Sequence, residues 1–258
     1  MTAIKRAYGW KKGPVVDHPH KFLAEISPVD LPRSVDMESQ CPEVYDQAQL
    51  GSCTGNAAGG LGQFIMMKKG LGNFVPSRLA LYWWNRLQDG TTGSDDGSSL
   101  TNAMRTLVKY GVPHESLWPY TDQGNQFAVK PAKAVWSDGY WHSIAKSLQV
   151  NQSITDMKSC LAQGYPFIFG FTVYESFESQ EVANSGIMPM PGFREQVVGG
   201  HAVMAVGYDD ATQMVKVRNS WGTNWGQNGY FFMPYQYISD TNLSSDFWTG
   251  HDFIRFKK

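Results

Sequence analysis

Residues 199–233 read GGHAVMAVGYDDATQMVKVRNSWGTNWGQNGYFFM. Within this stretch, residues 202–208 form a continuous apolar run, and residues 213–218 alternate between polar and apolar side chains. Two such runs on either side of a short polar turn, here residues 209–211, are typical of an antiparallel hairpin. We therefore predict a β-hairpin at this point of the chain.

The register of this hairpin decides which side chains meet. If Tyr208 pairs with Thr212, the same register sets His201 opposite Asn219. An amide oxygen that accepts the hydrogen of one imidazole nitrogen fixes the tautomer, and the other nitrogen can then take a proton from a nucleophile. His201 and Asn219 are therefore candidates for a base and its orienting group, although a lone histidine beside a strand is usually structural.

The chain divides into a mainly helical first half and a β-rich second half. In the first half, apolar side chains recur at helical spacing and glycines follow the last turns. The predicted helices cover residues 53–69, ended by Gly70, residues 78–88, capped by Ser77, and residues 100–108, ended by Gly111. Further along, we predict a helix over 154–163 and strands over 167–173, 202–208, 214–218 and 229–233.

Cys53 stands at the first position of the helix predicted over 53–69. Unpaired N–H groups and the helix dipole favour a thiolate there, so we expect the pKa of Cys53 to lie below the free value of about 8.5. Gln47 lies on the preceding loop, from which its side-chain amide can donate to an oxyanion at the same helix end. Each residue alone has a plainer explanation, because a single thiol is more often inert and a single glutamine is more often solvated.

The composition argues against several classes of function. The 22 Lys and Arg residues nearly balance the 23 Asp and Glu residues, so no strong field attracts nucleic acid or an anionic membrane. The longest apolar runs span about eight residues, far fewer than the roughly 20 of a membrane span. Residues 1–13 lack the apolar core of a secretory signal peptide. We expect a soluble protein, cytoplasmic or exported by a non-classical route, with no nucleic acid or membrane partner.

Three segments resemble the nucleophile, histidine and asparagine motifs of the papain and cathepsin family of cysteine peptidases. They are DQAQLGSC at 46–53, GGHAVMAVGY at 199–208 and NSWGTNWGQNGY at 219–230. Their order, and the separation of the cysteine from the histidine, agree with that family. LPRSVD at 31–36 is similar to the family's mature N-terminus, and WPY at 118–120 and GYP at 164–166 also resemble it.

The resemblance implies a papain-like two-domain α+β fold. Residues 31–135 would form a helical left domain that carries Gln47 and Cys53. Residues 136–258 would form a β-barrel-like right domain that carries His201 and Asn219, with the active-site cleft between the two. Residues 1–30 would form an N-terminal arm.

The resemblance also implies a cysteine endopeptidase that acts on peptide or protein substrates. Cys53, His201 and Asn219 would form the triad, and Gln47 would share the oxyanion hole with the backbone N–H of Cys53. The residues expected to contact substrate are Gly97, Ser98, Gly200 and Trp221, of which Trp221 would also shield the histidine–asparagine bond from water. The alternatives are an acyl-transfer enzyme, such as a transamidase, on the same triad, and a catalytically silent papain-like binding module.

The chain departs from the family's pattern near the nucleophile. Leu50 stands where many relatives have a disulfide cysteine, and Thr54 stands where an aromatic residue is usual. With three cysteines, the chain lacks the usual disulfide set, so we expect its stability to come from the core. Cys160 falls on the apolar side of its predicted helix and is interpreted as a core residue. Cys41 has no assigned role.

No metal site or cofactor is predicted. Histidines that bind metals commonly recur at short, fixed spacings along the chain. The remaining histidines show no such spacing; they are His18, His20, His114, His142 and His251. We expect His18 and His20 to be solvated.

The N-terminal arm is much shorter than the helical propeptide of most relatives. A peptidase made without a signal peptide is exposed to the proteins of its own cell, so we expect the arm to be an inhibitory segment that makes the chain a zymogen. Its apolar anchors would be Tyr8, Trp10, Phe22 and Leu23. The alternative is that the arm is an ordered strap around the back of the domains.

Overall fold

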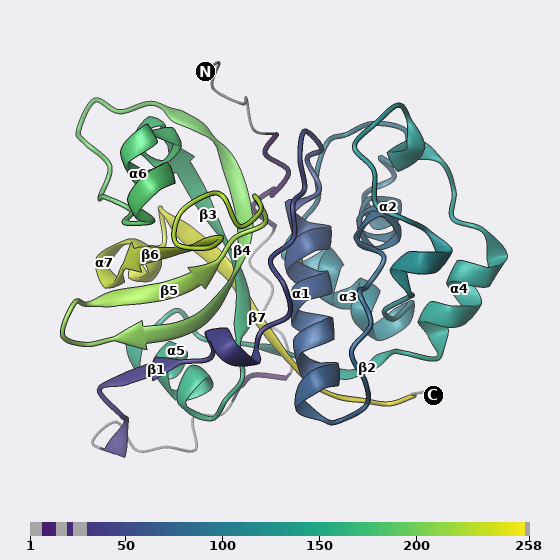
Figure 1. The fold of residues 1–258 in the computed structure, drawn as a ribbon, viewed down its shortest axis with the longest axis horizontal. Helices are drawn as coiled ribbons and strands as arrows, with labels where there is room; N and C mark the ends of the chain where they lie inside the picture. The colour runs from purple at the N-terminus through teal and green to yellow at the C-terminus, as the bar shows by residue number, and fades with distance from the viewer. Residues whose placement is uncertain (1–6, 14–19, 23–29, 256–258) are drawn as a thin grey trace.

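The helical half of the protein is arranged around one buried helix, α1. The computed structural model describes residues 7–13, 20–22 and 30–255, and Figure 1 shows α1 between most of the strands on the left and the longer helices of this half on the right. The helices of this half are α1 (Cys53–Lys68), α2 (Arg78–Asp89), α3 (Leu100–Lys109) and α4 (Lys133–Tyr140), with short 3-10 helices η2 (Glu38–Gln40), η3 (Glu115–Leu117) and η4 (Gln126–Ala128). None of the described helices has the length and apolar character to cross a membrane.

Capping residues set the limits of these helices. Ser77 begins α2, because its Oγ accepts a hydrogen bond from the backbone N–H of Ala80. Gly90 ends α2 in the left-handed conformation, with φ of 72°. The first turn of α1 has no side-chain cap at Ser52, which leaves its N–H groups directed at the site described below.

Seven strands form one antiparallel sheet in the order β2-β7-β3-β4-β5-β6, and β1 pairs with β4. The strands are β1 (Ser34–Asp36), β2 (Ile144–Gln149), β3 (Phe167–Tyr174), β4 (Val197–Asp209), β5 (Met214–Arg218), β6 (Tyr230–Pro234) and β7 (Ser244–Phe253). The helices of this half are α5 (Ile154–Ala162), η5 (Glu175–Glu178), α6 (Gln180–Ser185) and α7 (Tyr235–Ser239). The predicted α+β class is confirmed.

The turn of the β4–β5 hairpin differs from the predicted one. Tyr208 pairs with Val215 and not with Thr212, since β5 begins only at Met214. Gln213 just before it has φ of 54°, a left-handed conformation that suits a turn. The connection between the strands is therefore longer than the three residues predicted.

A bulge shifts the same hairpin again farther from the turn, so that Met204 pairs with Arg218. A continued ladder would set His201 opposite Trp221, and the predicted pairing of His201 with Asn219 in the register was wrong. The ladder stops at Arg218, where β5 ends. Asn219 instead lies beyond the strand, held by a hydrogen bond from its N–H to the carbonyl of Gly229.

The other predicted elements agree closely with the structure. The predicted helices correspond to α1, α2, α3 and α5, and the predicted strands correspond to β3, β4, β5 and β6, of which β4 begins earlier than expected. Sequence analysis missed β1, β2 and β7 and the helices α4, α6 and α7. The domain limit between residues 135 and 136 stays a prediction; β1, which precedes α1 in the chain, pairs with β4 of the sheet.

A shared hydrophobic cluster joins α1 to the sheet. Its members include Ala58, Leu61 and Ile65 of α1 together with Ile168, Ala202, Met204 and Trp248 of the strands. All of these side chains are buried, and burial of apolar surface is the main force that holds the two halves together. The junction sets the N-terminal end of α1 beside β4, where the backbone of Ala202 reaches Cys53.

Candidate active site

The predicted base and its orienting residue meet at the end of β4. His201 Nε2 lies 2.8 Å from Oδ1 of Asn219, and both side chains are buried. The backbone N–H of Ser220 donates to the same amide oxygen at 2.8 Å, which fixes the orientation of the amide. The ring of Trp221 stacks on that of His201, with centroids 4.9 Å apart. This buried environment strengthens the histidine–asparagine bond.

Gln47 connects the loop before α1 to the asparagine loop. Its backbone N–H donates to the carbonyl of Ser220 at 2.9 Å, and its Oε1 accepts from the hydroxyl of Ser220 at 2.6 Å. Its Nε2 is thereby directed away from Ser220 and donates to the carbonyls of Leu50 at 3.0 Å and Ala7 at 3.2 Å. An amide donor therefore already holds a peptide carbonyl, that of Ala7, at the N-terminal end of α1.

Cys53 is the first residue of α1 and is fully buried. Burial raises the pKa of its thiol to about 11, while hydrogen bonds from the backbone of Ala202, Gly9 and Thr54 act in the opposite direction. The expected low pKa is therefore wrong for this state of the chain. The helix N-terminus lowers the pKa of the thiol as predicted, but removal of the sulfur from water raises that pKa by a larger amount.

The N-terminal arm supplies part of that burial. The Tyr8 ring packs edge-on against both His201 and Trp221, with centroids 6.0 and 6.2 Å away. The Tyr8 hydroxyl donates to Glu178 at 2.6 Å. The next residue, Gly9, contributes the backbone hydrogen bond to Cys53. Residues 7–9 thus contact Gln47, Cys53 and His201, three of the four predicted chemical groups.

Trp10 continues this path, and its ring packs against the sheet at Gly170 and Gly200. Its backbone N–H donates to the carbonyl of Gly200 at 3.0 Å, and its side chain is 8% exposed. A Cβ at Gly170 would lie 1.9 Å from the indole, so only glycine leaves room for the ring there. At the far end, the indole N–H donates to Asp246 at 3.5 Å.

Each residue predicted to bind substrate contacts the arm. Ser98 accepts from the N–H of Lys11 at 3.0 Å and donates to the carbonyl of Gly9 at 2.8 Å, in a parallel β-bridge. Gly97 has φ of 70°, and a Cβ there would lie 2.0 Å from the Gly9 carbonyl oxygen. Gly200 and Trp221 make the contacts given above. The arm therefore contacts all four residues of the predicted set.

A second part of the arm runs along the sheet. The N–H of Phe22 donates to the carbonyl of Gln149 at 2.8 Å, and that of Gln149 donates to the carbonyl of His20 at 3.0 Å. Phe22 is buried in the hydrophobic cluster on the sheet side. The predicted anchor Leu23, like His18, lies outside the described residues.

Two polar residues of this region escaped the sequence analysis. Ser220 follows Asn219 directly, and its role on Gln47 could have been suspected from that position alone. Asp246 carries no local signal; its carboxylate accepts hydrogen bonds from the N–H of Leu100 at 2.9 Å, from the indole of Trp248 at 2.6 Å and from Thr101 at 3.1 Å. These partners come together only through the fold.

The three cysteines are all free thiols. Cys160 is fully buried, and burial raises the pKa of its thiol, as expected for a core residue. Cys41 is half-buried, and burial raises its pKa to about 11. Leu50, at the position of the missing disulfide cysteine, packs with Leu79 and Tyr82. Apolar contacts thus take the place of a covalent bond there.

Comparisons with known proteins identify the family. The model of the papain family cysteine proteases matches residues 31–248. An uncharacterized peptidase C1-like protein of Acanthamoeba polyphaga mimivirus is 40% identical over 243 residues, which cover 88% of this chain and 77% of that protein. A cathepsin B-like protein of Giardia intestinalis is 29% identical over 221 residues, which cover 80% of this chain and 70% of that protein.

The fold also has a solved counterpart. Xylellain, a cysteine protease from Xylella fastidiosa, superposes with a TM-score of 0.89 at 36% sequence identity, over 95% of this chain and 96% of that one. A procathepsin B of Trypanosoma congolense shares the fold, with a TM-score of 0.74 at 21% identity over 95% of this chain and 86% of that one. The papain-like fold expected from the sequence motifs is therefore confirmed. This chain belongs to the papain family of cysteine proteases and is a cysteine peptidase, a hydrolase.

Proposed function

We propose that the chain is an endopeptidase in which Cys53 is the nucleophile, His201 the base and Asn219 its orienting group. The observation that carries the proposal is the 2.8 Å contact between His201 Nε2 and Asn219 Oδ1. Because the amide oxygen can only accept, Nε2 carries the hydrogen and Nδ1 is the basic nitrogen. This is the tautomer that a base for the Cys53 thiol needs.

The proposed reaction gives each of these groups one part. The Cys53 thiol gives its proton to His201 Nδ1, and the sulfur attacks the carbonyl carbon of the substrate. Nε2 of Gln47 and the backbone N–H of Cys53 donate to the oxyanion. His201 returns the proton to the leaving amine, and a water activated by His201 hydrolyses the thioester. Exclusion of water by Trp221 makes each of these hydrogen bonds stronger.

We further propose that the arm, residues 1–30, keeps the enzyme inactive as a zymogen. Support comes from the contacts of Ala7 with Gln47, of Gly9 with Cys53 and of Trp10 with Gly200. These groups are the ones that an extended peptide substrate would use. The strap interpretation has its own support in the bond between Phe22 and Gln149, and one segment can perform both functions.

Substitution of Cys53 or His201 tests the chemistry. Cys53→Ala and His201→Ala should abolish turnover of peptide substrates with an unchanged circular-dichroism spectrum. Retained turnover by either folded variant would refute the assignment. Analysis of the products separates hydrolysis from transamidation, since hydrolysis yields a free acid whereas added amine traps the acyl group in a transamidase.

Deletion of residues 1–28 tests the role of the arm. Inhibition predicts a clear rise in kcat/KM on a small fluorogenic peptide. An unchanged rate together with a lower melting temperature would leave the arm as a structural strap only. Activity of the full chain under the same conditions is the reference for both outcomes.

A further inference from the structure

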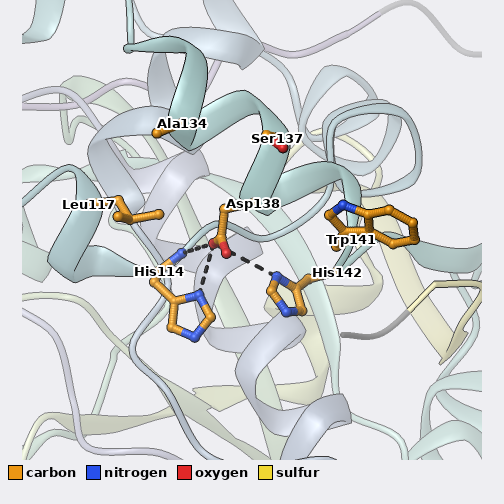
Figure 2. Close-up of a pocket in the computed structure, with 7 residues that line it drawn as sticks. All are labelled: His114, Leu117, Ala134, Ser137, Asp138, Trp141 and His142. Atoms are coloured by element: carbon orange, nitrogen blue, oxygen red, sulfur yellow. Dashed lines mark hydrogen bonds and ion pairs between the residues drawn. The ribbon is translucent and has the colours of Figure 1, made fainter. Parts of the chain in front are cut away.

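Two histidines and an aspartate outside the proposed active site converge at the outer end of the helical half. Asp138 lies in the last turn of α4, His142 follows the end of that helix, and His114 precedes η3. Figure 2 shows both imidazole rings turned toward the carboxylate of Asp138. One possible ligand atom of each residue lies within 4.8 Å of the other two. The three side chains thus form a compact set of nitrogen and oxygen ligands.

The separations are close to those that a zinc ion requires. Nδ1 of His114 lies 2.8 Å, and Nδ1 of His142 lies 3.8 Å, from Oδ2 of Asp138. In a tetrahedral site with metal–ligand bonds of about 2.0–2.2 Å, neighbouring ligand atoms lie about 3.4 Å apart. The distance from His114 to Asp138 must therefore lengthen, and the distance from His142 to Asp138 must shorten, by only about half an ångström.

Aromatic packing holds the two imidazole rings in place. The Phe74 ring stacks on His114, with centroids 3.5 Å apart, and meets His142 edge-on at 5.1 Å. The backbone N–H of His114 also donates to Oδ2 of Asp138 at 2.9 Å, which orients the carboxylate. Ligands that are held by neighbouring groups lose less entropy when a metal binds.

The backbone fixes the two segments that carry these residues. A Cβ at Gly111 would lie 1.8 Å from the carbonyl oxygen of Gly139, so the chains approach at a distance that only glycine permits. The N–H of Val112 donates to the carbonyl of His142 at 3.2 Å. The ligand set therefore spans two segments that are already joined.

The cluster opens into a cavity of about 420 Å³. His114 and Asp138 are partly exposed, whereas the His142 side chain is 3% exposed. Besides the three ligands, the cavity is lined by Leu117, Ala134, Ser137 and Trp141. A water molecule thus has room to complete the coordination of a metal, and Asp138 is the only charged side chain in that lining.

We propose that His114, Asp138 and His142 form a binding site for a divalent transition-metal ion, of which Zn²⁺ is the test case. Two imidazole nitrogens and one carboxylate oxygen are ligands that Zn²⁺ prefers, and they are a poor set for Ca²⁺ or Mg²⁺. The metal would tie the end of α4 to the segment before η3. Its role would be structural, since the cluster is separate from Cys53 and His201.

The test measures Zn²⁺ binding by calorimetry on the full chain with Cys53→Ala, which removes the thiol of the proposed active site. We expect one Zn²⁺ ion to bind, with a rise in melting temperature relative to protein in EDTA. His114→Gln and Asp138→Asn, both at partly exposed positions, should each weaken that binding by at least about 10-fold. His251→Gln is the matched control, because His251 stacks on Tyr165 and does not belong to the cluster. This variant should bind Zn²⁺ with the affinity of the parent protein.

Absence of stoichiometric Zn²⁺ binding in the Cys53→Ala protein would overturn the proposal. Equal affinity in the His114→Gln and His251→Gln variants would also overturn it, because the ion would then lie elsewhere. Circular dichroism and melting temperatures in EDTA show whether each variant is folded. The absorption of bound Co²⁺ gives a second readout, since intense visible bands are expected from a tetrahedral site and should be lost in Asp138→Asn.

Discussion

Trp10→Ala is the sharpest perturbation of the proposed inhibition, because it removes the main apolar contact of the arm with the active site. Trp10 is buried, with 8% of the residue exposed. It contacts Gly170, Gly200 and Asp246 and has no part in the proposed chemistry. The substitution should therefore loosen the arm and leave the catalytic groups intact.

The size of the effect can be worked out from this burial. An aromatic side chain buries about 150–250 Å², which at about 25 cal/mol per Å² is worth about 4–6 kcal/mol as an upper bound. The side-chain entropy lost when the indole docks offsets part of this free energy. We therefore expect the substitution to destabilise the docked arm by about 3 kcal/mol. Since about 1.4 kcal/mol changes an equilibrium constant tenfold, the fraction of molecules whose arm is undocked should rise about 100-fold. The activity of the arm-deleted protein sets the ceiling.

The assay compares kcat/KM of the parent, Trp10→Ala and Lys12→Ala on one fluorogenic peptide. Among the described residues, Lys12 makes one exposed hydrogen bond, to the carbonyl of Thr241, so its removal should change the rate by less than about twofold. If folded Trp10→Ala is no faster than Lys12→Ala, the inhibitory role of the indole is refuted. A synthetic peptide of residues 7–13 should inhibit the arm-deleted enzyme, and the same peptide with alanine in place of Trp10 should inhibit it far less.

An epoxysuccinyl inhibitor should label Cys53 rapidly after arm deletion and leave Cys41 and Cys160 unlabelled in a mass-spectrometric digest; equal labelling of all three would contradict the activation of Cys53. In the full chain, burial raises the pKa of Cys53 to about 11, so its thiol stays protonated at lower pH and its alkylation by iodoacetamide should accelerate up to about that pH. The arm-deleted protein should reach its plateau at lower pH, and superimposable profiles would exclude the arm as the cause of the raised pKa. Asn219→Ala should retain more activity than His201→Ala, because water can partly replace an orienting amide; equal losses in kcat would show that Asn219 does more than orient.

Local patterns predicted the elements that carry the site because those patterns have local causes. The start of α2 follows from the Ser77 hydroxyl, which caps its first turn, and the end of α1 follows from Gly70, which has φ of 64°. Cys53 was placed at a helix N-terminus because apolar side chains recur at helical spacing after it, although Ser52 makes no side-chain cap there. The strands β2 and β7 lack strict alternation of polar and apolar side chains, and both contact the helix α3 as well as other strands.

The contact between His201 and Asn219 was expected for a reason that the structure does not support. The predicted ladder would have brought them together by register, whereas the real hairpin contains a bulge and ends at Arg218. Bulges depend on packing with other strands, which no short window of sequence records. The pair meets because the chain after β5 is held to Gly229 and because Ser220 orients the amide.

Effects that depend on distant segments were beyond the sequence patterns. The helix N-terminus alone would lower the pKa of Cys53, as predicted. Burial by other parts of the chain raises that pKa by more, so the net shift is upward. Likewise, His114 and Asp138 are far apart in the sequence and meet only because Gly111 lets two segments touch. Spacing rules detect ligands on a single helix or loop and do not detect this arrangement.

The way in which the arm is bound bears on how it can be released. Its hydrogen bonds with Gly200 and Ser98 involve backbone atoms, and any extended peptide can replace them one for one. The advantage of the arm over a substrate therefore lies in the Tyr8 and Trp10 side chains and in the covalent tether. A tethered segment acts at an effective concentration on the order of millimolar, whatever the protein concentration. Dilution will consequently not activate the enzyme, whereas cutting the chain between Trp10 and Leu31 converts the arm into a free peptide that dilution removes.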